Sequence, residues 1–240
     1  KENHLQPLNL GKRGVINTEP DITKARESLS EEGFYSFKLS REERVSFAVV
    51  LMIGSDDYIT LSEIADQLFV SRSTIIQDLE HIKNFCRERH LYVLSHSNKG
   101  LLLEGREIDK RNLLLDMIQS GNSIFKVEPI FQHLTQCLSK NLKIDLEDIS
   151  IIEKIINEAE HIYGRFLTDR SFVQLRNYFQ LSLYRLRKSH YVEYGGKKNS
   201  KWEMAKGMIN QIQQFIVKEI PDTEIYYVAD VLNRMKYIKK

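Results

Sequence analysis

A group of hydrogen-bonding side chains stands at the start of one amphipathic segment. It consists of Ser71, Arg72, Ser73 and Thr74, with Gln77 about one turn further along. Hydroxyl and guanidinium groups beside the free N–H groups at a helix N-terminus can bind phosphate oxygens, and polar side chains on the exposed face of such a helix can reach base edges. The chemistry that these residues indicate is recognition of a nucleic acid.

Three predicted helices would position this group. Capping boxes begin the first two, Ser40 with Glu43 and Thr60 with Glu63, and Ser71 begins the third. The first helix should bury a stripe made of Val45, Ala48, Val49 and Met52, and the second a stripe made of Leu61, Ile64, Ala65 and Leu68. The apolar stripe of the third helix is Ile75, Leu79, Ile82 and Cys86. Each helix should therefore pack through one face.

The segment after the third helix predicts a β-hairpin. Two runs of β-forming residues in "LYVLSHSNKGLLLEG" are joined at Asn98, Lys99 and Gly100. Three helices followed by a hairpin are the order of a winged helix-turn-helix, whose third helix enters the DNA major groove while the hairpin touches the backbone or minor groove. The candidate DNA-binding residues are Ser71, Arg72, Ser73, Thr74, Gln77 and Lys99.

An ordinary solvated helix would show the same polar face. On a wheel of about 100° per residue, Ser73, Gln77 and Asn84 lie opposite the apolar stripe, which any exposed helix permits. Glu80 beside them opposes deep groove contact, and residues 40–105 hold seven Lys and Arg against ten Asp and Glu. DNA binding must therefore depend on local placement of charge rather than on bulk charge.

The domain organisation predicted is mainly α, a winged helix-turn-helix domain followed by an all-α helical bundle. Residues 40–105 form the first domain, 106–121 a linker helix and 122–240 the bundle. Residues 1–39 hold a remnant wing and a linker, because "LQPLNLGKRGVINTE" matches "LYVLSHSNKGLLLEG" at three identical positions with an offset of 86 residues. The ending "VLNRMKYIKK" is typical of a continuing helix, which suggests a fragment of a longer protein.

Composition excludes several other classes. No apolar run reaches the roughly 18 residues of a membrane span and no signal peptide is evident, so a cytoplasmic location with no membrane partner is expected. Cys86 and Cys137 cannot form a disulfide framework, and a zinc set with His81, His90 and His96 is disfavoured because Cys86 lies on the buried stripe. Phosphate-loop, dinucleotide-binding and hydrolase motifs are missing, so we expect no enzyme, cofactor or metal.

The chain resembles the bacterial regulators of sugar phosphotransferase operons, the mannitol and lichenan operon activators and their Mga-like relatives. "YITLSEIADQLFVSRSTIIQDLEHI", "NKGLLLEG" and "KRNLLLDMI" resemble their helix-turn-helix, and "LSLYRLRKS" with "TEIYYVADVL" resembles their PTS regulation domain, or PRD. The resemblance implies a homodimeric activator that binds operator DNA, of which the second helix-turn-helix and the first PRD are present here. It implies phosphotransferase-system proteins as partners, acting on regions outside this segment.

The resemblance fails at the positions where such domains carry phosphorylated histidines. The aligned residues are Tyr178 and Val231, so no phosphorylation site is carried over. The predicted bundle holds three other histidines, His133, His161 and His190. The alternatives are a protein-interaction or dimerisation module without DNA affinity, and an RNA-binding antiterminator. The RNA-binding alternative lacks the small β-rich domain that such relatives use.

Overall fold

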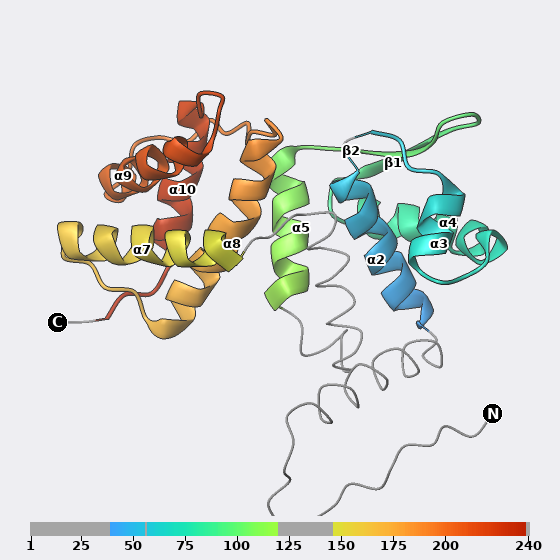
Figure 1. The fold of residues 1–240 in the computed structure, drawn as a ribbon, viewed down its shortest axis with the longest axis horizontal. Coiled ribbons are helices and arrows are strands. Elements are labelled where there is room, and N and C mark those ends of the chain that lie inside the picture. The colour runs from blue at the N-terminus through green and yellow to red at the C-terminus, as the bar shows by residue number, and fades with distance from the viewer. Residues whose placement is uncertain (1–38, 56, 120–145, 239–240) are drawn as a thin grey trace, which may run out of the picture. The chain divides into compact units, whose positions relative to one another are not determined.

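The computed structural model describes residues 39–55, 57–119 and 146–238, and Figure 1 shows their path. Residues 1–38, where the remnant wing is predicted, and residues 122–145 of the predicted bundle, with His133 among them, lie outside the described residues. Among the described helices, none is long and apolar enough to cross a membrane.

The first three helices begin at the predicted caps. Helix α2 spans Arg41–Gly54, α3 spans Leu61–Gln67 and α4 spans Arg72–Arg87. Both capping boxes form: the backbone N–H groups of Ser40 and Thr60 each donate to the glutamate three residues on, over 2.7 Å. These bonds satisfy N–H groups that have no backbone partner within the helix. The capping residues therefore determine where each of these two helices starts.

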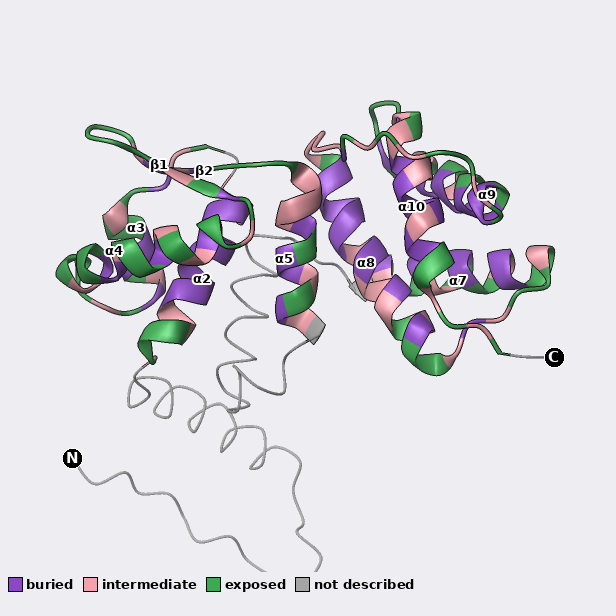
Figure 2. Ribbon diagram, turned by 180° about the vertical axis from the view of Figure 1, so that it is seen from behind, coloured by how far each residue is buried: buried purple, intermediate pink, exposed green. Residues whose placement is uncertain are grey.

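Helix α2 is more deeply buried than an amphipathic stripe predicts. Every residue from Val45 to Ile53 is buried, as Figure 2 shows along most of the helix. Helix α4 and strand β2 (Gly100–Glu104) pack against α2, and Arg185 donates to the carbonyl oxygen of Ile53 over 2.9 Å. The expectation of a single buried face was therefore wrong, because long-range neighbours cover the other faces.

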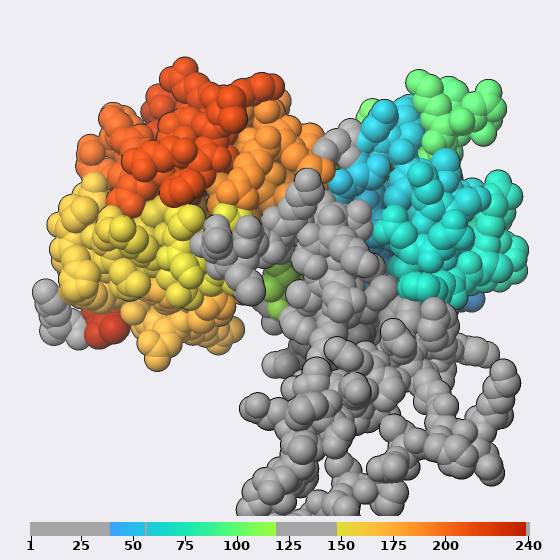
Figure 3. All heavy atoms as spheres, viewed as in Figure 1, coloured from blue at the N-terminus to red at the C-terminus, as the bar shows by residue number. Residues whose placement is uncertain are grey.

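The predicted hairpin forms from β1 (Tyr92–His96) and β2, which pair antiparallel with His96 opposite Gly100. Ile59 and Leu101 exchange two backbone hydrogen bonds of 2.8 Å, so the hairpin is also attached to the segment before α3. Gly100 has a φ of 109°, and a Cβ there would lie 2.4 Å from the carbonyl oxygen of Ile59. Glycine is therefore required at this attachment. In Figure 3 the tip of the hairpin stands out from the neighbouring helices.

The remaining described elements form a helical bundle, as predicted, and the helix predicted as a linker over 106–121 packs on it. They are α5 (Glu107–Gln119), α7 (Leu146–Tyr163), α8 (Asp169–Arg187), α9 (Trp202–Ile212), the short 3₁₀ helix η1 (Gln213–Phe215) and α10 (Asp222–Arg234). Helix α7 packs against α8 and α9, α10 packs against α9, and α5 packs against α8. Fully buried residues such as Ile156, Phe179 and Met208 lie in one apolar core.

Long-range and local contacts fix the ends of helices α9 and α10. The side chain of Gln213 bonds to the carbonyl oxygens of Ile216 and Lys218 and to the N–H of Ile220, which replaces helical hydrogen bonds with a turn. Helix α10 ends at Arg234, and Tyr237 then forms a β-bridge with Leu167. The expectation of a helix continuing through "VLNRMKYIKK" was therefore wrong over the described residues.

Candidate nucleic-acid interface

A cluster of hydroxyl groups opens helix α4. The Oγ of Ser71 accepts from the Thr74 N–H over 3.1 Å and lies 2.7 Å from the Ser73 Oγ and 2.8 Å from the Thr74 Oγ1. Ser71 and Ser73 are exposed, whereas Thr74 is half-buried. The hydroxyl hydrogens can therefore rotate toward a phosphate oxygen at the positive end of the helix dipole, while the Ser71 Oγ still accepts from the Thr74 N–H.

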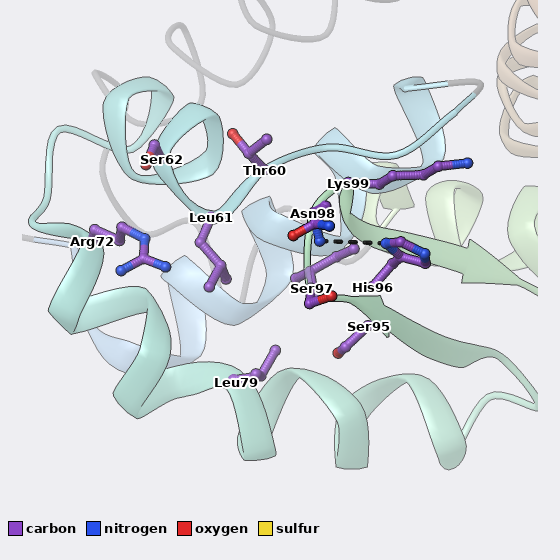
Figure 4. Close-up of a pocket in the computed structure, with 12 residues that line it drawn as sticks. Thr60, Leu61, Ser62, Arg72, Leu79, Ser95, His96, Ser97, Asn98 and Lys99 are labelled. Carbon is purple, nitrogen blue, oxygen red and sulfur yellow. Dashed lines mark hydrogen bonds between the residues drawn. The ribbon is translucent and has the colours of Figure 1, made fainter.

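The structure brings Arg72 and Lys99 to one hollow. This hollow has a volume of about 410 Å³ and lies between the start of α4, the start of α3 and the hairpin tip (Figure 4). Thr60 and Ser62 line it from the α3 side, and residues 95–101 line it from the hairpin. Both residues line the hollow although they are far apart in the sequence; the Arg72 guanidinium points into it, and the Lys99 side chain extends outward from its rim at the hairpin tip (Figure 4). Two cations on one side of the domain are an arrangement suited to a polyanion.

The hairpin tip is organised by an aromatic residue that sequence reasoning missed. The Lys99 Nζ lies 5.4 Å from the ring centroid of Tyr58, and the Tyr58 ring meets His96 edge to face at 5.8 Å. The His96 Nδ1 accepts from the N–H of Asn98 over 3.3 Å. Tyr58 reaches the tip because the adjacent Ile59 bonds to Leu101, a long-range contact that no local pattern signals.

Ser73 and Gln77 lie outside this hollow. Both are exposed on α4, together with Asn84 and the acidic Glu80. The structure therefore separates the predicted residues into two groups: the cations beside the hairpin, and the amide and hydroxyl side chains on the outer face of the helix. An outer face of this composition can bond to base edges, and Glu80 can accept from the amino group of cytosine.

A buried carboxylate holds α4 against α2. Asp78 is 1% exposed, and its two oxygens accept from Arg44 Nε over 2.6 Å and Arg44 Nη2 over 3.1 Å. The Arg41 Nε lies 3.3 Å from the same carboxylate. Asp78 was missed from the sequence, because its partners lie on another helix 34 or more residues away.

The zinc alternative fails at Cys86. This side chain is fully buried, and burial raises the pKa of its thiol to about 12, so it stays protonated. A cysteine that ligates zinc must be a thiolate. Among the described residues, no group of three or more His, Cys, Asp and Glu side chains is placed to hold a metal ion.

The two aligned histidine positions of the bundle are core positions here. Tyr178 and Val231 are both buried, and burial raises the pKa of the Tyr178 hydroxyl above its ordinary value. Among the described histidines of the bundle, His161 is exposed beside Phe166, and His190 is half-buried. The backbone carbonyl of His190 accepts from Arg111 over 2.9 Å.

Four buried charged residues connect α2, α5, α8 and α10, and we call them the ion network: Glu107, Arg111, Arg185 and Glu224. Arg185 donates to both oxygens of Glu107 over 2.8 Å and to the Ile53 carbonyl of α2. Arg111 donates to Glu107 over 3.0 Å and to both oxygens of Glu224 over 2.9 Å. The end of α2 is thereby joined directly to α8, and through Glu107 and Arg111 of α5 to Glu224 of α10.

Comparison with known proteins assigns both parts of the chain. A family model described as an HTH domain matches residues 44–101, and one described as a PRD domain matches residues 153–234. The chain is 22% identical over 197 residues to the probable licABCH operon regulator of Bacillus subtilis (strain 168), covering 78% of this chain and 29% of that protein. It is 22% identical over 220 residues to the transcriptional regulator ManR of the same organism, covering 88% and 32%.

The chain therefore contains an HTH domain followed by a PRD domain, as its resemblance to PRD-containing regulators predicted. It spans about a third of the length of the curated relatives that it matches. Both relatives are described as regulators.

Proposed function

We propose that this chain, an HTH domain joined to a PRD domain, is the DNA-binding and signal-relay segment of a transcriptional activator of a sugar phosphotransferase operon. It acts in the cytoplasm as a homodimer on operator DNA, and phosphotransferase-system proteins act on regions outside this segment. The observation that carries the proposal is the shared hollow of Arg72 and Lys99 within the part matched by the HTH model.

In the proposed complex, α4 lies in the major groove. Ser71, Arg72 and Thr74 bind phosphates at the start of the helix, and Lys99 binds the backbone from the hairpin. Ser73 and Gln77 face base edges. The acidic balance of residues 40–105 limits non-specific attraction, so affinity depends on these few contacts.

The test is a titration of the 240-residue chain with promoter DNA from beside its own gene, at two salt concentrations. Arg72→Ala and Lys99→Ala should each weaken binding and reduce the slope of log K against log salt by about 1, because one phosphate contact is lost. Arg170→Ala and Lys218→Ala remove exposed cations from the PRD part and should match the wild type. No binding at low salt by a folded chain would contradict the proposal and favour a protein-interaction module.

The ion network supports a relay role for the PRD domain. The Glu107 carboxylate lies between Arg111 and Arg185 and holds α5 in a fixed geometry on α8. Arg185 also donates to the Ile53 carbonyl oxygen in the last turn of α2. A movement of α8 or α10 would therefore be transmitted to the DNA-binding part rather than absorbed by a slack linker. Because Tyr178 and Val231 replace histidine, the signal would enter by packing and not by phosphorylation at these positions.

The ion network should make the free energy of unfolding fall as the pH is lowered into the acid range. Burial alone would raise the pKa of Glu107, but hydrogen bonds and charge from Arg185 and the charge of Arg111 hold it below its ordinary value. The stabilisation is therefore complete above the unfolded pKa of about 4.3 and is lost as pH falls through the lower folded pKa. Glu107→Gln should lower the free energy of unfolding by about 1–3 kcal/mol at pH 7.

Urea denaturation between pH 7 and pH 3 measures this difference. The wild type and Glu107→Gln should converge in acid, whereas Glu158→Gln, in an exposed pair with Lys154, should follow the wild type throughout. A Glu107→Gln deficit of the same size at pH 3 and at pH 7 would contradict the assignment.

A further inference from the structure

Helix α4 exposes one large aliphatic side chain. Ile76 is 47% exposed, whereas Ile75, Ile82 and Cys86 of the same helix are fully buried and Leu79 is half-buried. The exposed positions around it are otherwise polar. The isoleucine leaves nearly half of its surface to solvent, where a polar residue would be better solvated in the free protein.

Ile76 stands between the two groups of candidate DNA contacts. It lies one turn after Arg72 and three residues before Leu79, both of which line the hollow beside the hairpin. It also lies three residues after Ser73 and next to Gln77, on the outer face. Because residues three and four apart are neighbours on a helix, the isoleucine lies at the centre of this surface rather than at its margin.

The major groove offers one apolar group to such a side chain. Base edges there present hydrogen-bond donors and acceptors, except for the C5-methyl group of thymine. The phosphates on either side are charged and give an aliphatic side chain no such partner. A half-exposed isoleucine within a polar recognition face therefore complements a thymine methyl group.

We propose that Ile76 is a specificity-determining residue that contacts the C5-methyl group of a thymine in the operator. The inference rests on the DNA-binding function proposed above. Ile76 would supply discrimination between thymine and cytosine or uracil. Arg72 and Lys99 would supply affinity that is independent of sequence, so the two contributions can be measured separately.

The experiment is a double-substitution cycle on promoter DNA from beside the gene of this protein. The same fragment is prepared once with thymine and once with deoxyuridine throughout, which removes the C5-methyl groups while leaving the Watson–Crick pairs intact. Wild type and Ile76→Ala are titrated against both DNAs. Ile162→Ala is the matched control, since Ile162 is 70% exposed on the PRD part.

Loss of one methyl contact should weaken binding about fourfold, as expected for burial of a single methyl group. Wild type should lose this factor on deoxyuridine DNA, and Ile76→Ala should bind both DNAs with the same reduced affinity. Ile76→Val should keep most of the discrimination, and Ile162→Ala should behave as the wild type on both. Every variant should keep the salt slope of the wild type.

Independent effects of Ile76→Ala and deoxyuridine would overturn the inference, because they would show that the side chain and the methyl groups do not meet. Wild-type affinity of Ile76→Ala for thymine DNA would also overturn it. In both cases intact, salt-dependent binding that weakens in Arg72→Ala leaves the DNA-binding function standing. Absence of salt-dependent binding by the wild type would overturn the function and the inference together.

Discussion

Replacing Arg111 with methionine should lower the free energy of unfolding by about 3–5 kcal/mol. The guanidinium is fully buried and donates to Glu224 twice, to Glu107 and to the carbonyl of His190. Methionine fills a similar volume but leaves the Glu224 carboxylate inside the core without its counter-charge. Urea denaturation followed by circular dichroism measures the loss.

A second substitution separates lost pairing from poor packing. Arg111→Met combined with Glu224→Leu removes both charges, and it should recover a large part of the loss because apolar pairs often replace buried ion pairs at little cost. Lys154→Met, at a solvent-exposed pair, should change stability by less than about 0.5 kcal/mol. A double variant less stable than Arg111→Met alone would contradict this, because it would show that Glu224 stabilises the core by more than its pairing with Arg111, for example through the hydrogen bond that it accepts from the Val192 N–H.

Replacing Asp78 with alanine should destabilise the winged domain by about 2–4 kcal/mol and abolish DNA binding at physiological salt. The change leaves Arg44, which is 15% exposed, without the bidentate carboxylate that fixes α4 on α2. The recognition helix would then lose its orientation relative to the hairpin. Thermal denaturation and the same DNA titration would report both effects.

Asp66→Ala serves as the control for this prediction. Asp66 is an exposed acidic residue on α3, and its removal should leave stability within about 0.5 kcal/mol of the wild type. Arg44→Ala should reproduce the destabilisation by Asp78→Ala, because it breaks the same pair from the other side. Wild-type stability of both Asp78→Ala and Arg44→Ala would refute the structural role of this pair.

The local features of the fold could be predicted from the sequence. The capping residues Ser40, Thr60 and Ser71 act on N–H groups three residues away, and the Gly100 turn depends on a single backbone conformation. Such interactions are encoded within a few neighbouring residues. The order of helices and hairpin follows from them, and so does the exposure of Ser73, Gln77 and Lys99.

The long-range features could not be predicted in this way. Asp78 meets Arg44 across 34 residues, Arg185 meets Glu107 across 78, and Arg111 meets Glu224 across 113. When its own helix is considered alone, each of these charged side chains would be expected at the surface. Their burial is decided by which helices pack together, and this also explains the all-round burial of α2 and the bridge that follows α10.

Site-directed DNA cleavage tests most directly whether the exposed face of α4 lies in the major groove of operator DNA, as we propose. An iron chelate would be attached through Gln77→Cys, in a chain with Cys137 replaced by serine, because Cys86 is buried and unreactive. The control carries the chelate at Val217→Cys, fully exposed on the PRD part. We expect cuts clustered around one groove of the operator from position 77 and none from position 217. Cuts from position 217 alone, or none from position 77 in a bound complex, would contradict the proposal.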